Sequence, residues 1–468
     1  MSPHSRRHFL DRVASTVSAA SLGSASLSTS LIATAFTSLR GRIAHADDLN
    51  RKLYGELYPV LDQTTGLPLI RLPKGFRYTS YGWTNQPLAS GSKTPSDHDG
   101  MAVIAEDGDT ITLCRNHEVM SPGRAFWREH HYDPFGSGGC TSLTFDRRKE
   151  VFVTAWESLA GTMKNCAGGA TPWQTWLSCE ETLDGPDTTF EDGSQNPLTQ
   201  PHGFVFEVPV GGQKEPKPLL SLGRFVHEAV AIDPSSHTVY LTEDTGTAGF
   251  YRMTPERAMD IASFGRFEMM RVKQRDDVRS GVKPDQLFDV SWVEIPDRLR
   301  AHSPGTRDGL GVYRQGKDLG GLTFARLEGV AIHDGKVFIT ATSGGDAKAG
   351  QVWEYTPELE QLKLIFESPN PDVLDMPDNM CISVRGELLL CEDGTRVPQR
   401  LQILTIDGLL CPFAENNIVL EQLYGHRGDF RNSEWAGATF SKDGSWLFVN
   451  IQKPGVTFAI TGPWKTLY

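Results

Sequence analysis

Short apolar runs recur along the whole chain in pairs, and each pair flanks a two-residue turn. Residues 330–332, for example, precede Asp334-Gly335, and residues 337–339 follow it. A pair such as Asp-Gly between two apolar runs is a strong signal for a β-hairpin. Equivalent turns are expected at Asp107-Gly108, Ser236-His237, Arg385-Gly386 and Asp443-Gly444. The pattern therefore predicts a chain built of antiparallel hairpins.

A third strand-like run follows most of these hairpins and completes a repeating unit, at residues 249–252, 351–355, 401–404 and 456–459. Two further units, residues 99–145 and 165–207, fit less cleanly and bring the total to six. Six such repeats predict an all-β, six-bladed β-propeller with loop and short helical insertions. A β-sandwich is the alternative, but it does not predict repeats in register. The longest departure is the stretch 256–320, and residues 255–259 at its start are expected to form a short helix.

Acidic residues recur at matching positions of these units. The start of the first strand holds Cys166, Glu228, Glu328 and Asn379, with Asp99 placed less securely. The end of the second strand holds Glu180, Glu243 and Glu392, each followed directly by another acid, Glu181, Asp244 and Asp393. Asn116 and Glu118 lie slightly beyond this second set. Both strand ends lie at the same face of a propeller, so we expect these side chains at one mouth of its channel.

Carboxylates that converge in this way repel each other unless a cation lies among them. Glu228 and Glu328 each precede an apolar run on an inner strand, where an unpaired carboxylate is costly. Their positions favour a metal-binding role. For any single acid the alternative is a solvated strand end or a turn cap, and this alternative is favoured for Asp244 and Asp393, each closely followed by a glycine.

Two members of the pattern are not acids. Cys166 occupies the position at which other units place a carboxylate, and a thiolate favours a transition metal beside calcium-type oxygen sites. A small buried cysteine is the alternative, and Cys179 is the second choice for a thiolate ligand. Arg326 lies two residues before Glu328, so both side chains face the same side of a strand. Its guanidinium is placed to hold a phosphate oxygen or to pair with one of the acids.

The composition, with 39% hydrophobic and 22% charged residues, is that of a soluble globular protein. The formal net charge is −12, and it becomes −16 without residues 1–46, which carry five arginines and one aspartate. So acidic a chain is not expected to bind nucleic acid. Cys381 and Cys391 lie symmetrically about the turn at Arg385-Gly386, where either a disulfide or two small buried residues fit.

The N-terminus has the features of an export signal. Arg6-Arg7 is followed by a weakly apolar stretch at 13–37, and Ala44-His45-Ala46 is a small-x-small cleavage site. Serine and threonine interrupt the apolar stretch too often for a membrane anchor. We therefore predict a twin-arginine signal peptide at 1–46 and a single catalytic domain at 47–468. The export machinery is then a partner, and the mature protein, expected to be a monomer, is periplasmic or secreted.

Several motifs resemble those of the PhoX-type bacterial alkaline phosphatases. Besides the twin-arginine signal they are Asn116-His117-Glu118, Asn165-Cys166-Ala167, Gly223-Arg224-Phe225-Val226-His227-Glu228, Arg326-Leu327-Glu328-Gly329 and Phe440-Ser441-Lys442-Asp443-Gly444. The resemblance implies a six-bladed propeller with a cluster of Fe³⁺ and Ca²⁺ ions, acting on phosphomonoesters outside the cytoplasm. It also implies that Cys166, Glu228 and Glu328 bind iron, and that Asn116 and Arg326 contact the phosphate. One departure is the last unit, where Asn450 and Gln452 replace acids, so that this unit is expected to supply a neutral ligand or none.

These observations predict metal-assisted hydrolysis of small phosphate esters. No Gly-x-Ser-x-Gly elbow and no His-Glu-x-x-His zinc motif occurs in the sequence. Two alternatives stay open: a calcium-dependent propeller lactonase or esterase, and a non-catalytic calcium-binding propeller. Metal content distinguishes them, because calcium without iron favours the lactonase.

Overall fold

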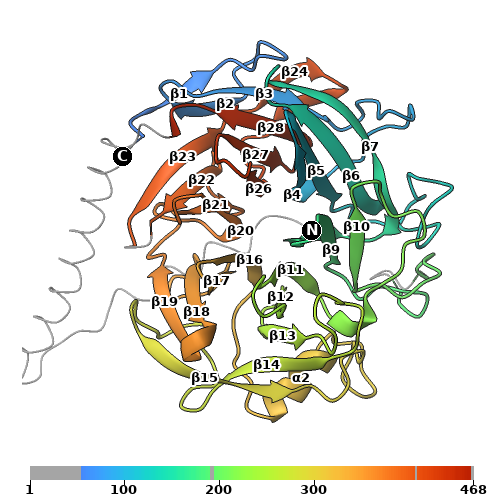
Figure 1. Ribbon diagram of the computed structural model, residues 1–468, viewed down its shortest axis with the longest axis vertical. Coiled ribbons are helices and arrows are strands. Elements are labelled where there is room, and N and C mark those ends of the chain that lie inside the picture. Colours follow the sequence, from blue (N-terminus) through green and yellow to red (C-terminus); the bar gives the residue numbers. More distant parts are fainter. Residues whose placement is uncertain (1–53, 190–193, 406–407, 465–468) are drawn as a thin grey trace, which may run out of the picture.

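The apolar runs form antiparallel sheets that are arranged around a central axis (Figure 1). The structure, a computed structural model, describes residues 54–189, 194–405 and 408–464. The predicted signal peptide at 1–46 lies outside the described residues. In the described ranges, no helix is both long enough and apolar enough to span a membrane. The protein is mostly β-structure, as the sequence predicts.

Consecutive segments of the chain form the sheets. The first sheet contains β4 (His98–Asp107), β5 (Thr110–His117), β6 (Gly138–Asp146) and β7 (Val151–Thr162). The second contains β8 (Asn165–Ala170), β9 (Thr175–Glu180) and β10 (Val205–Pro209). The third begins with β11 (His227–Ile232), β12 (Val239–Glu243), β13 (Tyr251–Thr254) and β14 (Arg266–Val272). The fourth contains β16 (Leu327–His333), β17 (Lys336–Ala341), β18 (Gln351–Thr356) and β19 (Gln361–Glu367).

The last sheets tie the two ends of the chain together. The fifth contains β20 (Pro377–Ile382), β21 (Leu388–Glu392), β22 (Arg400–Leu404) and β23 (Leu410–Asn416), extended at its outer edge by β2 (Ile70–Pro73) and β1 (Leu57–Val60). The sixth contains β26 (Trp435–Phe440), β27 (Trp446–Ile451) and β28 (Val456–Thr461). Its outer strand, β3 (Arg77–Tyr81), comes from the N-terminal part of the chain and pairs antiparallel with β28.

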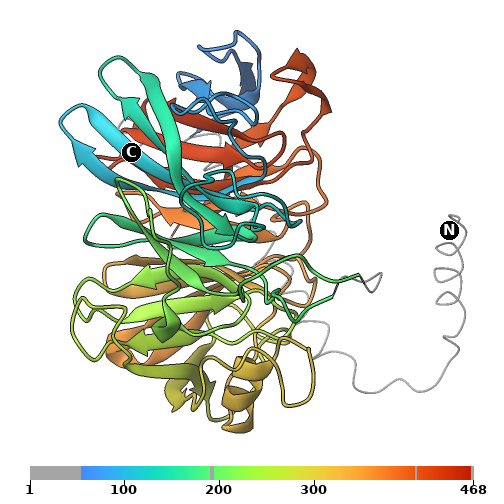
Figure 2. The same ribbon diagram turned by 90° about the vertical axis from the view of Figure 1, so that its right-hand side faces the viewer.

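Further elements lie at the periphery. β15 (Leu287–Glu294) pairs with both β14 and β19 and so joins the third and fourth sheets at their outer edges. β24 (Val419–Leu423) and β25 (His426–Asp429) form a separate hairpin. Among the described residues, the helices are α2 (Gly311–Asp318), which lies at one edge of the molecule in the side view of Figure 2, and two single 3₁₀ turns, η1 (Leu220–Leu222) and η2 (Pro357–Leu359). The helix expected at residues 255–259 is wrong: Met259 has a φ of 63°, which a right-handed helix does not accommodate, and the helix of this stretch is α2.

The first strands of the six main sheets form a closed ring. β4 contacts β8, and the contacts continue through β11, β16, β20 and β26 back to β4. These strands lie nearest the centre in Figure 1, and the apolar clusters lie mostly between neighbouring sheets. One such cluster joins Trp435 and Phe458 of the sixth sheet to Phe413 of the fifth. The burial of apolar side chains between neighbouring sheets therefore stabilises the ring. The start of each inner strand is not needed for this packing.

Every inner strand has the same irregularity near its start. The register shifts between His98 and Met101 in β4 and between His227 and Val230 in β11, and the other four strands shift at the equivalent place. A bulge of this kind re-aims the side chain at the extra residue. The residues that directly follow the last residue paired before each shift are Asp99, Cys166, Glu228, Glu328, Asp378 and Gly437. The repeat therefore places one residue of each sheet at the same end of the ring.

Gly437 is the sixth member because no side chain fits there. Its φ is 59°, and a Cβ atom would come within 2.5 Å of the Asp99 carbonyl oxygen and 2.6 Å of the Met101 nitrogen. We expect Gly437→Ala to lower the free energy of unfolding by about 2–4 kcal/mol, through strain and overpacking together. Urea denaturation measures this loss.

Gly335→Ala is the matched control for this prediction. Gly335 has a φ of 71° in the β16–β17 turn, but a Cβ atom added to it would have no described atom within 4 Å. Only backbone strain remains there, so the loss should be about 1 kcal/mol. Equal losses for the two variants would show that the contact between β26 and β4 is not tight.

Candidate metal centre

A hollow of about 220 Å³ lies at the end of the ring where the bulges are. Its acidic lining residues are Asp97, Asp99, Glu118, Glu181, Glu228, Asp244, Glu328, Asp378, Asp393 and Glu434. Cys166, Arg326, Met120, Gln452 and Lys453 complete the lining. Acidic side chains from all six sheets or the loops beside them thus meet in one small space, which we call the acidic mouth.

The inner-strand members of the mouth are shielded from solvent. Cys166, Glu228 and Glu328 are each 3% exposed, and Asp99 is 5% exposed. Each comes from a different sheet of the ring. The structure therefore brings together four of the predicted site residues, which the sequence spreads over residues 99–328.

The second set of acids comes from the residues that directly follow the second strand of a sheet. Glu118 follows β5, Glu181 follows β9, Asp244 follows β12 and Asp393 follows β21. Glu118 and Glu181 were predicted here. Asp244 and Asp393 also line the mouth, although the sequence favoured a turn role for them. Because side chains alternate along an extended chain, the preceding residue in each sheet faces the other way.

Glu180 is one of these preceding residues, and its carboxylate is used inside the protein. It accepts hydrogen bonds from the backbone nitrogens of Met163 and Gly203, both at 2.9 Å, and lies 2.5 Å from His202 Nδ1. Burial lowers the pKa of His202, but Glu180 and Asp133 together raise it to about 9. The structure thus directs Glu180 away from the mouth and pairs it with an imidazolium.

Glu243 and Glu392 are directed away in the same manner. Glu243 accepts hydrogen bonds from the Gly249 nitrogen at 2.8 Å and from the Tyr251 hydroxyl at 2.7 Å. Glu392 forms a bidentate ion pair with Arg400, with distances of 2.8 Å to Nε and 2.7 Å to Nη2. These two predicted ligands, like Glu180, hold the ends of their strands in place instead of lining the mouth.

Asn379 and Asn116 also lie elsewhere. The Oδ1 atom of Asn379 accepts a hydrogen bond from the Gly437 nitrogen at 3.2 Å, because the bulge in β20 turns Asp378, and not Asn379, toward the mouth. Asn116 is fully buried, and its Nδ2 donates to the carbonyl oxygens of Cys166 and Ala167 at 3.0 and 2.8 Å. Asp378, one residue before Asn379, therefore lines the mouth at the place that the sequence assigned to Asn379.

The amide of Asn116 has no capacity left for a phosphate. Its Oδ1 accepts hydrogen bonds from Trp176 Nε1, Ser178 Oγ and Cys140 Sγ, at 2.8, 2.9 and 3.0 Å. With the two bonds made by Nδ2, every donor and acceptor of the side chain is occupied. Asn116 connects the first sheet to the start of β8 and holds the backbone that carries Cys166.

Within the mouth the possible ligand atoms form overlapping groups. In each group the atoms lie within 4.8 Å of one another, and the groups are Cys166–Glu181–Glu228, Glu228–Glu328–Asp378, Asp378–Asp393–Glu434 and Asp99–Glu118–Glu434. Glu228, Asp378 and Glu434 each belong to two groups. The arrangement therefore suits several adjacent cations that share carboxylate ligands.

The pKa values of these acids show how unfavourable their charges are without a cation. Burial, followed by the charge of neighbouring carboxylates, raises the pKa of Asp99, Glu228 and Glu328 well above the ordinary range. Burial also raises the pKa of Glu118 and of Asp378 to about 7. A bound cation favours the charged form of each group, so the same carboxylates are well suited to hold one.

The thiol of Cys166 shares this environment. Burial and then the charge of Glu228 raise its pKa well above the ordinary value. Its Sγ atom lies 3.3 Å from the His227 carbonyl oxygen, at the wall of the mouth. Cys179, the second choice for a thiolate, is fully buried and does not line the mouth. Cys381 and Cys391 are both free thiols, because the register pairs Cys381 with Leu389, so no disulfide links them.

Arg326 lies between two of the acids. Its Nη2 atom is 2.8 Å from Asp244 Oδ2 and 2.7 Å from Glu328 Oε1. Burial lowers the pKa of the guanidinium, but Glu328 and Asp244 outweigh burial and raise it, so the group is charged. Its side chain is 35% exposed. The salt bridge that the sequence left open is therefore present, and the guanidinium also borders the mouth.

Asp378 and Glu434 are lining residues that sequence reasoning missed. Asp378 stands directly before Asn379. Glu228 and Glu328 each stand a fixed number of residues before the apolar run of their strand, and the same spacing in β20 would have identified Asp378. Glu434 stands one residue before β26, and the sixth sheet was expected to supply no acid. Gln452 of that sheet donates a hydrogen bond to Glu118 Oε2 at 2.8 Å. No repeat in the sequence marks Glu434, because it lies outside the strand.

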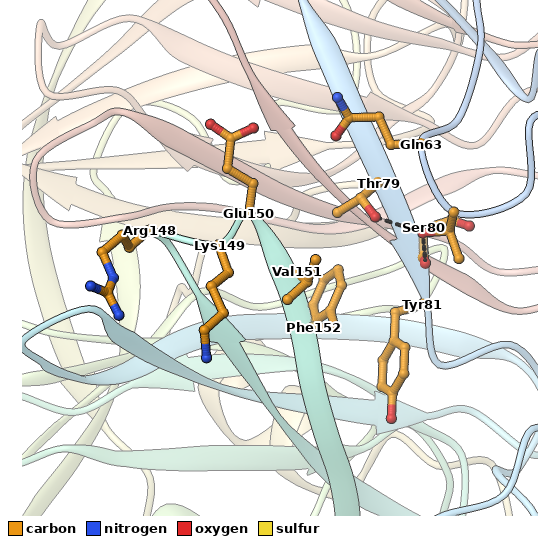
Figure 3. A pocket seen from close by; sticks show the side chains of 10 residues that line it. Gln63, Thr79, Ser80, Tyr81, Arg148, Lys149, Glu150, Val151 and Phe152 are labelled. Carbon is orange, nitrogen blue, oxygen red and sulfur yellow. Dashed lines mark hydrogen bonds between the residues drawn. The ribbon is translucent and has the colours of Figure 1, made fainter.

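A second hollow, of about 600 Å³, lies at the outer rim between β3 and β7 (Figure 3). Thr79, Ser80 and Tyr81 line it from β3, and Arg148 and Lys149 lie at its other side. Its single carboxylate among the described lining residues, Glu150, pairs with Arg77. Among its described lining residues this hollow has no group of acids, unlike the acidic mouth.

Comparison with known proteins agrees with this geometry. The model of the family described as alkaline phosphatase PhoX matches residues 53–157 and 148–455. The chain belongs to the PhoX alkaline phosphatase family. Membership makes the protein a phosphoric monoester hydrolase. Among curated proteins, none matches the sequence.

A solved structure shares the fold. It is described as Pseudomonas fluorescens PhoX in complex with vanadate, a transition state analogue. The two chains are 17% identical, with a TM-score of 0.64, and the match covers 88% of this chain and 98% of the other. At this identity the likeness shows a common fold, and the roles of individual residues in this member of the family rest on its own geometry.

Proposed function

We propose that this protein is a metal-dependent phosphatase that hydrolyses phosphate monoesters outside the cytoplasm, at the mouth of a six-bladed propeller. The observation that carries the proposal is the convergence of buried carboxylates and one thiol in the acidic mouth. Like charges in so small a space need cations to balance them. Family membership supplies the reaction class.

The propeller interpretation rests on the closed ring of inner strands. Each of the six main sheets contributes its first strand to the ring and carries its other strands outward. The pairing of β3 with β28 closes the ring with strands from both ends of the chain. We further propose that this single domain acts as a monomer.

The donor set of the mouth fits iron and calcium. Cys166 lies with Glu181 and Glu228, and a soft thiolate beside carboxylates suits iron. The all-carboxylate groups around Asp378 and Glu434 suit calcium, which prefers oxygen ligands. When bound, these cations would supply charge neutralisation for the phosphoryl oxygens and a lowered pKa for a water nucleophile.

The protein's own residues orient the substrate. Arg326 is fixed through Nε and Nη2, and no hydrogen bond within the described residues engages its Nη1 atom. We propose that this guanidinium donates to a phosphoryl oxygen, which a charged, pre-positioned donor does well. Asn116 acts at a distance from the substrate, because its amide holds the backbone of Cys166.

The proposed location follows from the N-terminal sequence. Arg6-Arg7 and the cleavage site at Ala44-His45-Ala46 support export through the twin-arginine machinery, which carries folded proteins. Folding before export would let the metal centre form in the cytoplasm. Fractionation of cells that produce the intact chain and an Arg6→Lys/Arg7→Lys variant tests the location.

Metal removal tests the proposed reaction. Natively exported protein should contain iron and calcium by elemental analysis and should hydrolyse p-nitrophenyl phosphate. Exhaustive treatment with a chelator should lower the rate by more than about 100-fold, because one lost electrostatic contact at the transition state already costs about that much. Undiminished activity after complete metal removal would contradict the mechanism, and calcium without iron would favour the lactonase interpretation.

A further inference from the structure

Two cations border the acidic mouth among its described lining residues, Arg326 and Lys453. They are held very differently. Arg326 lies within 2.8 Å of carboxylates on both sides. Lys453 Nζ lies 3.7 Å from Asp97 Oδ1, and its side chain is 61% exposed. A contact this long and this exposed holds the ammonium weakly, so Lys453 is the cation that can move to meet a ligand.

The backbone beneath Lys453 is firmly placed although the side chain is not. The Lys453 nitrogen donates to Ser433 Oγ at 2.8 Å. The side-chain amide of the neighbouring Gln452 donates to Glu118 Oε2 at 2.8 Å, and the Gln452 backbone nitrogen donates to the Glu434 carbonyl oxygen at 3.3 Å. The loop after β27 is thus tied to residues of the mouth itself. It presents a flexible, charged side chain on a fixed base.

Exposure gives the order of these groups from the floor of the mouth to its rim. The side chains of Glu328 and Asp244 are 4% and 6% exposed, that of Arg326 is 35% exposed, and that of Lys453 is 61% exposed. A phosphoryl group held beside Arg326 would lie among the buried side chains of the mouth. The alcohol part of its ester would then point to the exposed rim that Lys453 borders.

We propose that Lys453 is a specificity-determining residue that binds a negative group on the alcohol part of the substrate. It would favour phosphate esters that carry a second anion, such as a carboxylate, over esters of neutral alcohols. The rim around Lys453 is acidic, and Asp97 and its neighbours would repel a substrate with a second anion if the ammonium were absent. An ammonium is a mobile point charge and suits a group whose position varies from one ester to another.

This inference rests on the proposed function, and two matched substrates test it. 3-Phosphoglycerate and glycerol 3-phosphate are both phosphate monoesters, and they differ by a carboxylate in place of a hydroxymethyl group. The quantity to measure is the ratio of kcat/KM for the first ester to that for the second. Lys453→Gln should lower this ratio about five-fold, mostly through KM, and Lys453→Arg should restore most of it. Raising the salt concentration should reduce the wild-type ratio and have less effect on the Lys453→Gln variant.

Lys442→Gln is the control. Lys442 belongs to the same sheet but lies in the β26–β27 turn, at the opposite end of these strands, and its loss should leave the ratio unchanged. An unchanged ratio in Lys453→Gln, or an equal fall for both esters, would overturn the inference while leaving the phosphatase proposal intact. If the metal-loaded wild-type protein hydrolyses neither ester, the proposed function itself fails, and the inference fails with it.

Discussion

Glu328→Gln should lower phosphatase turnover by about a thousand-fold, which corresponds to about 4 kcal/mol in the activation barrier. Glu328 lies on the floor of the acidic mouth, within 4.8 Å of ligand atoms of Glu228 and Asp378, and it also fixes Arg326. The substitution keeps the size of the side chain but removes its charge. A cation site and the orientation of the guanidinium are therefore weakened together. Turnover of p-nitrophenyl phosphate and calcium binding by calorimetry measure the two effects.

Glu243→Gln is the matched control, since Glu243 is also a buried glutamate at a strand end of the ring. Its carboxylate accepts hydrogen bonds from Gly249 and Tyr251 and does not line the mouth. We expect this variant to bind calcium with wild-type affinity and to keep most of its turnover. Equal losses in the two variants would show that both glutamates bind metal. The assignment of Glu243 to the strand end would then be wrong.

Arg400→Met should lower the free energy of unfolding by about 3–5 kcal/mol, because it leaves the buried carboxylate of Glu392 without its cation. The Arg400 side chain is 8% exposed and that of Glu392 is fully buried, and the guanidinium also donates to the Asp372 carbonyl oxygen at 3.0 Å. Urea denaturation measures the loss.

Two further variants separate the ion pair from other causes. Arg400→Met/Glu392→Gln removes both charges and should recover much of the lost stability. Arg71→Met breaks a 3.5 Å pair with Glu415 in which the arginine side chain is 41% exposed, and it should cost less than about 1 kcal/mol. If Arg400→Met is as mild as Arg71→Met in metal-loaded protein, a bound cation compensates Glu392, and Glu392 is a ligand after all.

The hairpins and their order could be read from the sequence because they depend on local chemistry. The expected turns at Asp107-Gly108, Asp334-Gly335 and Asp443-Gly444 join β4 to β5, β16 to β17 and β26 to β27. Turn residues restrict the backbone over two or three positions, and apolar alternation marks the strands on either side. The acids at the ends of these strands could be recognised for the same reason, since each stands at a repeated distance from a turn.

Which acid of a pair faces the mouth could not be read in this way. Glu180 and Glu181 are neighbours and chemically identical, yet one pairs with His202 and the other lines the mouth. A shift of one residue reverses the direction of a side chain on a strand, and the bulge in each inner strand introduces such a shift. Asn379 was chosen over Asp378 because the bulge in β20 has no sequence signal of its own.

The sequence by itself determined the all-β class, the repeated hairpins, and the abundance of acids at one end of the strands, because these depend on composition and local spacing. Only the tertiary structure decided which carboxylates converge. It brought Glu434 and Lys453 to the mouth from loops that no repeat marks, and it sent Glu180, Glu243 and Glu392 to partners in their own sheets. The physical reason is that convergence depends on the closure of the ring, which places residues from distant parts of the chain within a few ångströms of each other.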